Sequence, residues 1–123
     1  MGRPAQRFED LPKSWQKWLT RIKAADDKWR RAEDRRKATV DRLVAETGRA
    51  ESTVRNMPEY EEQWKQAETL RIERAELFLA ASKRGVTMYR IAKHLGYRSQ
   101  RPVAAAVESL RGERVDYRRP ASA

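Results

Sequence analysis

The sequence contains no cysteine and only one histidine among its 123 residues. A chain without cysteine forms no disulfide bonds, and with a single histidine it lacks the ligands of a zinc finger. Glycine and proline are scarce, at five residues each, and most of them fall where helices are expected to begin or end. No long apolar run is present, so the sequence predicts neither a membrane-spanning helix nor the apolar segment of a signal peptide.

Positive charge is in clear excess, with a formal net charge of +10. Such a surplus favours a polyanionic partner, because neutralising phosphates releases their condensed counterions. The charge is unevenly spread: residues 59–76 carry six acids against three bases, and residues 83–119 carry ten bases against three acids. The charged segments lack the separate apolar and basic faces of a helix that lies on a membrane, so no membrane partner is expected.

Helical periodicity dominates the first half. Apolar residues recur at steps of three and four from Trp15 to Trp29, which predicts an amphipathic helix that starts after an N-cap at Asp10 and runs to the mid-30s, with a potential break at residues 26–27. Thr39 is then expected to cap a short helix over residues 40–47 that ends at Gly48. A third helix is predicted over residues 50–57.

The second half repeats this plan. A long helix is predicted from Pro58 to about Arg84, followed by a helix over residues 88–95 with Thr87 as its cap. The last helix is expected from near Gln100 to Arg111. No strand pattern is evident, so the fold class is all-α.

Two segments, 48 residues apart, share one pattern of an amphipathic run, a glycine, several polar residues and a second amphipathic run. They cover residues 42–57 (RLVAETGRAESTVRNM) and 90–110 (RIAKHLGYRSQRPVAAAVESL). Both resemble the helix-turn-helix of bacterial and phage DNA-binding proteins, in which the second helix enters the major groove. We therefore predict two small trihelical helix-turn-helix units joined by a long helix. The predicted divisions are a basic flexible arm (1–10), an N-terminal unit (11–57), a C-terminal unit that includes the long linking helix (58–112) and a flexible basic tail (113–123).

In the second segment, Ile91, Leu95, Val103 and Val107 are spaced to pack the two helices together. The polar residues between them are expected to project from the start of the last helix toward base edges, where Arg pairs with guanine and Gln with adenine. The predicted base-reading residues are Arg98, Ser99, Gln100, Arg101 and Ala104. The alternative is an ordinary helical hairpin with a basic rim.

In the first segment, Leu43, Val44, Val54 and Met57 are expected to supply the packing. Its Ser-Thr-Val run resembles homeodomain-like bacterial motifs, whose hydroxyl groups bond phosphate or base. The residues expected to read bases are Arg49, Ser52, Thr53, Arg55 and Asn56. The alternative is a short helix that only supports the long ones.

Neighbouring polar groups are expected to contact phosphates: Lys37, Thr39, Thr87, Lys93, Tyr97, Arg111 and Arg114. Residues 1–4 resemble the core of an AT-hook, which implies a minor-groove arm with Arg3 and Arg7. An unstructured tail is the alternative for this arm.

The tandem arrangement resembles that of actinobacteriophage immunity repressors with two DNA-binding domains. The resemblance implies a sequence-specific regulator of transcription that binds double-stranded DNA as a monomer in the cytoplasm of a bacterial cell, close to the nucleoid. A dimer is the alternative. Repression would follow from occupancy of an asymmetric site of roughly 10–14 base pairs. No enzymatic activity, cofactor, metal or small-molecule substrate is expected, because the sequence lacks a phosphate-binding loop, a metal-ligand cluster and a nucleophile with a partner base.

Two other functional classes fit the same features. A small terminase subunit of a phage packaging motor also begins with a helix-turn-helix. In that interpretation, residues 59–84 would be the helix through which the subunits assemble into a ring. A nucleoid-type architectural protein would bind DNA with a steep salt dependence and little sequence preference. The mass in solution and the ratio of specific to random affinity distinguish these classes.

Overall fold

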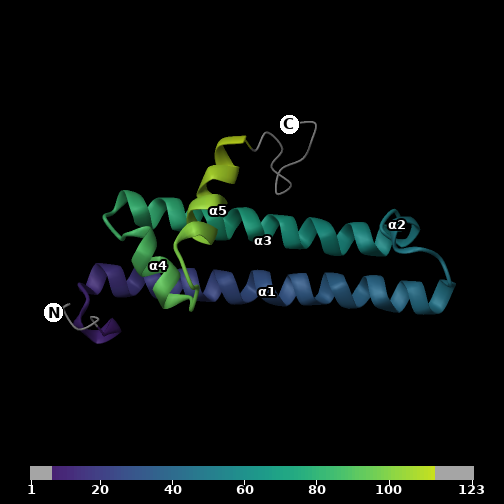
Figure 1. Cartoon of the computed structure of the whole chain (residues 1–123), viewed down its shortest axis with the longest axis horizontal. Coiled ribbons are helices and arrows are strands. Elements are labelled where there is room, and N and C mark those ends of the chain that lie inside the picture. Colours follow the sequence, from purple (N-terminus) through teal and green to yellow (C-terminus); the bar gives the residue numbers. More distant parts are fainter. Residues whose placement is uncertain (1–6, 113–123) are drawn as a thin grey trace.

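The computed structural model describes residues 7–112, and every regular element in that range is a helix (Figure 1). The elements are a 3-10 helix η1 (Phe8–Asp10) and five α-helices: α1 (Lys13–Thr47), α2 (Glu51–Val54), α3 (Pro58–Lys83), α4 (Met88–His94) and α5 (Arg101–Gly112). The predicted all-α fold class is therefore confirmed.

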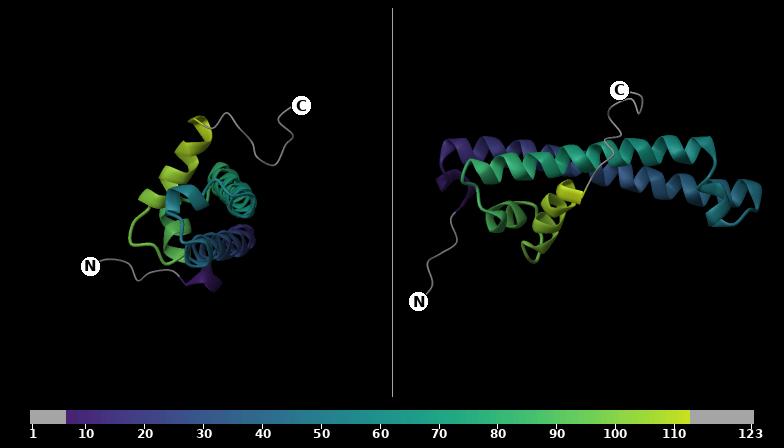
Figure 2. Two further views of the ribbon diagram at one scale, coloured as in Figure 1. Left: turned by 90° about the vertical axis from the view of Figure 1, so that its right-hand side faces the viewer. Right: turned by 90° about the horizontal axis from the view of Figure 1, so that it is seen from above.

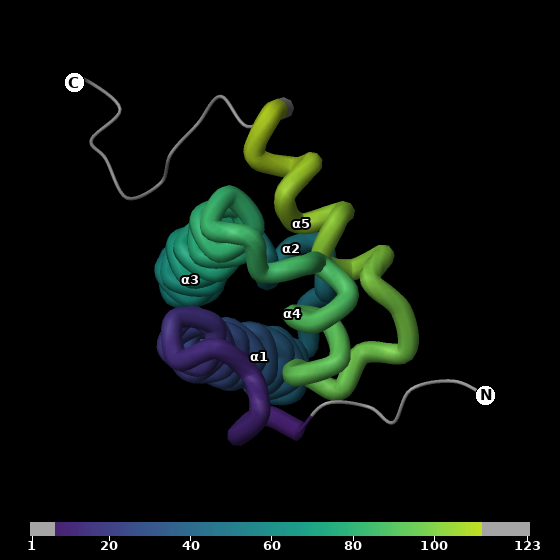
Figure 3. The backbone as a smooth tube through the Cα atoms, turned by 90° about the vertical axis from the view of Figure 1, so that its left-hand side faces the viewer, coloured from purple at the N-terminus to yellow at the C-terminus, as the bar shows by residue number. Residues whose placement is uncertain are grey.

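The two longest helices, α1 and α3, form an antiparallel hairpin (Figure 1). At about 1.5 Å of rise per residue, the 35 residues of α1 extend over roughly 52 Å. Both views of Figure 2 place α2, α4 and α5 on the same side of this hairpin, with α2 at one end and α4 and α5 toward the other. Seen from its end in Figure 3, the molecule has α1 and α3 as one layer and α4 and α5 as a second.

Helix α1 differs from its prediction, because it continues without a break from Lys13 to Thr47. The predicted break at residues 26–27 and the predicted new helix start at Thr39 are both wrong. Residues 13–47 contain neither glycine nor proline, and pairs such as Arg36 and Glu33, with 2.6 Å between Nη2 and Oε2, add local support. The expected N-cap at Asp10 is also wrong, because Asp10 belongs to η1 and Pro12 precedes the first turn of α1.

Two hydrophobic clusters hold the helices together. The larger one lies where α4 and α5 pack on the hairpin, and the smaller one lies beside α2. The larger cluster contains Leu11, Leu19, Ile22, Phe78, Ala81, Val86, Ile91, Ala92, Leu95, Val103 and Val107. The smaller cluster contains Val40, Leu43, Val54 and Tyr60. The packing predicted for Ile91, Leu95, Val103 and Val107 is confirmed, and α1 contributes residues to both clusters.

Candidate nucleic-acid interface

Sharp turns connect the last three helices. Gly85 follows the end of α3 with φ at 94°, and Gly96 follows α4 with φ at 79°, a left-handed conformation that favours glycine. The Thr87 hydroxyl accepts a hydrogen bond from the backbone N–H of Arg90 at 3.1 Å, which confirms the predicted cap of α4. These turns direct α5 across the hairpin beside α4 (Figure 1).

The start of α5 presents polar side chains to solvent. Arg98, Gln100 and Arg101 are all exposed. Ser99 is exposed too, but its hydroxyl accepts a hydrogen bond from the backbone N–H of Arg101 at 3.3 Å. Ala104 is only half-buried, one position after the fully buried Val103. Four of the five predicted base-reading residues therefore lie together on an exposed segment, and one of them also caps the helix.

The first segment forms a smaller element than predicted. Helix α2 is a single turn of four residues, whereas a helix over residues 50–57 was expected. Pro58 disfavours the helical conformation at Met57, which has φ −78° and ψ 143°, so a helix cannot extend through residue 57 as predicted. All five residues expected to read bases are nevertheless exposed: Arg49, Ser52, Thr53, Arg55 and Asn56. The Asn56 side chain donates a hydrogen bond to the carbonyl of Ser52 at 3.3 Å.

The positions on α1 that adjoin the two segments indicate how far apart the segments lie along the hairpin. Asp26 of α1 contacts Tyr97, the residue before Arg98, and Gly48 at the end of α1 leads into α2. These two positions on α1 are 22 residues apart, or about 33 Å at the helical rise. The exposed residues around α2 and those at the start of α5 are therefore separated by the length of several helical turns, on one side of the hairpin (Figure 2).

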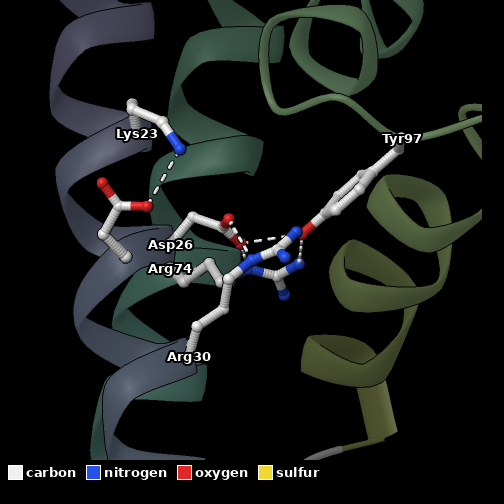
Figure 4. Close-up of polar contacts among 6 residues, drawn as sticks. Lys23, Asp26, Arg30, Arg74 and Tyr97 are labelled. Atoms are coloured by element: carbon white, nitrogen blue, oxygen red, sulfur yellow. Dashed lines mark hydrogen bonds and ion pairs between the residues drawn. The ribbon is translucent and has the colours of Figure 1, made fainter.

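A buried polar cluster joins the loop before α5 to the hairpin (Figure 4). The Asp26 carboxylate is fully buried and accepts hydrogen bonds from Arg74 Nε at 2.7 Å, Tyr97 Oη at 2.7 Å and Arg30 Nε at 2.8 Å. Burial raises the pKa of Asp26, but the hydrogen bonds and the Arg74 charge outweigh it and hold this pKa below its ordinary value. Asp26 is therefore ionised at neutral pH.

Two residues predicted to contact phosphates are unsuited to that role. Thr39 is buried in the middle of α1, because α1 does not end before it. Tyr97 directs its hydroxyl inward, to Asp26 and Arg74. The sequence offered no signal for this arrangement, since the partners lie 71 and 23 residues from Tyr97 along the chain.

The other predicted phosphate contacts have varied surroundings. Lys37 and Lys93 are exposed, and Thr87 is exposed although its hydroxyl caps α4. Arg111 is exposed and lies 3.5 Å from the carboxylate of Glu108. Arg7 is exposed beside η1. Arg3 and Arg114 lie outside the described residues.

Sequence inspection missed one aromatic residue on this side of the molecule. Tyr89 of α4 is 59% exposed, and the ammonium of Lys93 lies 5.9 Å from its ring centroid. His94, in the same helix, is half-buried and stacks on Phe8 with 5.2 Å between ring centroids. Burial, together with the charges of Lys23 and Arg90, lowers the pKa of His94 and favours its neutral form.

Comparison of the chain with protein-family models, with curated proteins and with solved structures yields no match. Among residues 7–112, no helix has the combination of length and apolar character needed to cross a membrane.

Proposed function

We propose that this protein is a sequence-specific regulator that binds double-stranded DNA and represses transcription by occupying its site. Its action would be that of the phage repressors that the sequence resembles, in the cytoplasm of a bacterial cell. The observation that carries the proposal is the exposed segment at the start of α5. There Arg98 and Gln100 are exposed in the loop before α5, and Arg101 is exposed as the first residue of α5, which Val103 and Val107 anchor in the larger cluster.

The chemistry of this segment suits base recognition. An arginine forms two parallel hydrogen bonds with guanine, and a glutamine does the same with adenine. The 12 residues of α5 extend over about 18 Å, which exceeds the roughly 12 Å width of the major groove. With α3 and α4 packed behind it, α5 has the support of a recognition helix in a trihelical helix-turn-helix unit.

The second exposed segment supports a site of two halves. The two positions on α1 that adjoin the segments, Asp26 and Gly48, are about 33 Å apart at the helical rise, which is close to one turn of B-DNA, roughly 34–36 Å. The residues exposed around α2 can therefore face the next major-groove segment on the same side of the duplex. Because α2 has one turn and α5 has three, we expect the half facing α5 to carry most of the sequence preference.

Selection from random duplex DNA, combined with sedimentation of the free protein and of the complex, tests this proposal. We expect one asymmetric consensus of roughly 10–14 base pairs, bound by a monomer of 14.4 kDa. A palindrome bound by a dimer would mean that one segment per chain reads bases. Failure to enrich any sequence would contradict the proposal; retained affinity that falls steeply with salt would then favour an architectural protein.

A further inference from the structure

Tyr97 is the last residue held inside the molecule before the exposed residues 98–100. Leu95 is buried and Tyr97 is half-buried, whereas Arg98, Ser99 and Gln100 are exposed. The next buried side chain is that of Val103 in α5. The half-buried or buried side chains nearest to residues 98–100 are therefore Tyr97 on one side and Val103 on the other, in addition to the backbone bond from Tyr97 N–H to the Ala92 carbonyl at 2.9 Å and the Ser99 bond at the start of α5.

The contacts of Tyr97 come from both helices of the hairpin (Figure 4). Its hydroxyl donates to Oδ1 of Asp26 in α1 at 2.7 Å and accepts from Nη2 of Arg74 in α3 at 2.5 Å. The guanidinium carbon of Arg30 lies 5.3 Å from the centroid of the tyrosine ring. One side chain thus links the loop to α1 and to α3.

The Tyr97 hydroxyl bonds to charged groups that are themselves buried, and this restricts the position of the tyrosine. Asp26 is fully buried and Arg74 is 5% exposed, and such a pair is tolerated only when its hydrogen bonds are satisfied. The Arg74 guanidinium is also enclosed by the rings of Trp29 and Phe78, at 4.3 Å and 4.6 Å from their centroids. A hydrophobic contact would accept several positions of the tyrosine, but these hydrogen bonds define one.

We propose that Tyr97 is a positioning residue for sequence recognition: its hydroxyl bonds to Asp26 and Arg74 fix the backbone of residues 98–100 so that their side chains meet the bases. This inference rests on the proposed function. Two parallel hydrogen bonds from an arginine to guanine require close alignment, so a small displacement of the loop weakens base contacts. Contacts to phosphate tolerate the same displacement, because they depend mainly on charge.

The substitution Tyr97→Phe tests this role, since it removes the hydroxyl and keeps the ring. The affinities for the selected duplex and for a random duplex are measured at one salt concentration. We expect the ratio of specific to random affinity to fall about ten-fold, comparable to the loss of one base contact. Loss of folded protein alone would lower both affinities equally and leave the ratio unchanged.

Tyr60→Phe is the matched control. The Tyr60 side chain is also buried, and its hydroxyl accepts a hydrogen bond from Arg36 Nη1 at 2.8 Å in the smaller cluster. Tyr60 belongs to the smaller cluster beside α2, whereas residues 98–100 directly precede α5, and α2 and α5 lie toward opposite ends of the hairpin (Figure 1). We expect Tyr60→Phe to leave the base preference in the half of the site facing α5 unchanged, whereas Tyr97→Phe relaxes the preference in that half.

A second variant, at the edge of the buried cluster, keeps the inference testable if Tyr97→Phe does not fold. Arg30→Gln alters a half-exposed side chain that contacts Asp26 and covers the Tyr97 ring, and we expect it to lower the ratio by a smaller factor. An unchanged ratio in every folded variant of this pair overturns the inference, provided that the wild type selects a site. A wild type that selects no sequence instead refutes the proposed function.

Discussion

Asp26→Asn is expected to destabilise the protein more than the same change at its neighbour Asp27. Asp26 is fully buried and accepts hydrogen bonds from three donors, whereas the Asp27 side chain is 41% exposed and pairs with Lys23 at 2.9 Å. An asparagine in place of Asp26 removes the charge opposite Arg74. Asparagine also has one acceptor oxygen where aspartate has two, so its NH2 group would face a donor that now bonds to the second oxygen.

The size of the expected loss in the free energy of unfolding follows from these contacts. Removing one partner of a buried ion pair costs about 3–5 kcal/mol, because the other charge stays buried without compensation. The bond from half-exposed Arg30 adds little, since exposed pairs contribute about 0.2–1 kcal/mol. We therefore expect Asp26→Asn to lower the free energy of unfolding by about 3–5 kcal/mol, and Asp27→Asn by less than about 1 kcal/mol.

Urea denaturation of both variants, followed by tryptophan fluorescence and circular dichroism, measures the two losses. The pH dependence supplies a second check. The pKa of Asp26 is lowered in the folded state, so its contribution is present above the unfolded pKa, near 4, and is lost as the pH falls through the folded value. The difference between wild type and Asp26→Asn should be constant from about pH 5 to 8 and shrink below about pH 4. Equal losses for the two variants, or a difference that grows in acid, would refute this reasoning.

Three further predictions concern DNA. Arg98→Ala or Arg101→Ala should cost about 1–3 kcal/mol on the selected site and little on random duplex in binding titrations; equal losses would assign these side chains to phosphates. Replacing Arg55 and Asn56 together by alanine should relax base preference at one end of the site only, as measured by repeated selection. An unchanged consensus would make the segment around α2 a support for the long helices. Insertion of about five base pairs between the two halves turns one half by about half a turn of the duplex, so band-shift titration should show a loss comparable to deletion of the weaker half. Equal affinity for the lengthened site would mean that one half alone is bound.

The packing of α4 against α5 within the larger hydrophobic cluster was predictable because its signals are local. Ile91, Leu95, Val103 and Val107 repeat with helical spacing on both sides of Gly96, and all four are buried as expected. The cap at Thr87 was equally accessible from sequence, since a threonine before an amphipathic run needs no distant partner to bond a free N–H. The all-α fold follows from many such local signals.

The incorrect predictions for Thr39, Asp26 and Tyr97 share a different cause. Thr39 resembles a helix cap, but a threonine also continues a helix when strong helix formers surround it and its side chain is buried against neighbouring elements. Asp26 resembles an exposed break point until Arg74, 48 residues away, supplies its counter-charge. Tyr97 resembles a surface residue for the same reason. The partners of buried polar groups are set by tertiary packing, which a helical period does not encode.

The continuity of α1 has a consequence for how the two exposed segments would work together. A break at Thr39 would have joined them through a hinge, and each could then adjust to the duplex separately. In the structure, Ala32, Thr39 and Val40 are buried along an unbroken helix, and Arg36 bonds to Tyr60 across the hairpin at 2.8 Å. Bending α1 between the two segments would disrupt this packing as well as the backbone hydrogen bonds of the helix. The separation between the segments is therefore a fixed property of the fold. Under the proposed function, a DNA site that matches this separation would gain contacts from both segments without any cost of ordering a hinge, and a site with different spacing would be limited to the contacts of one segment.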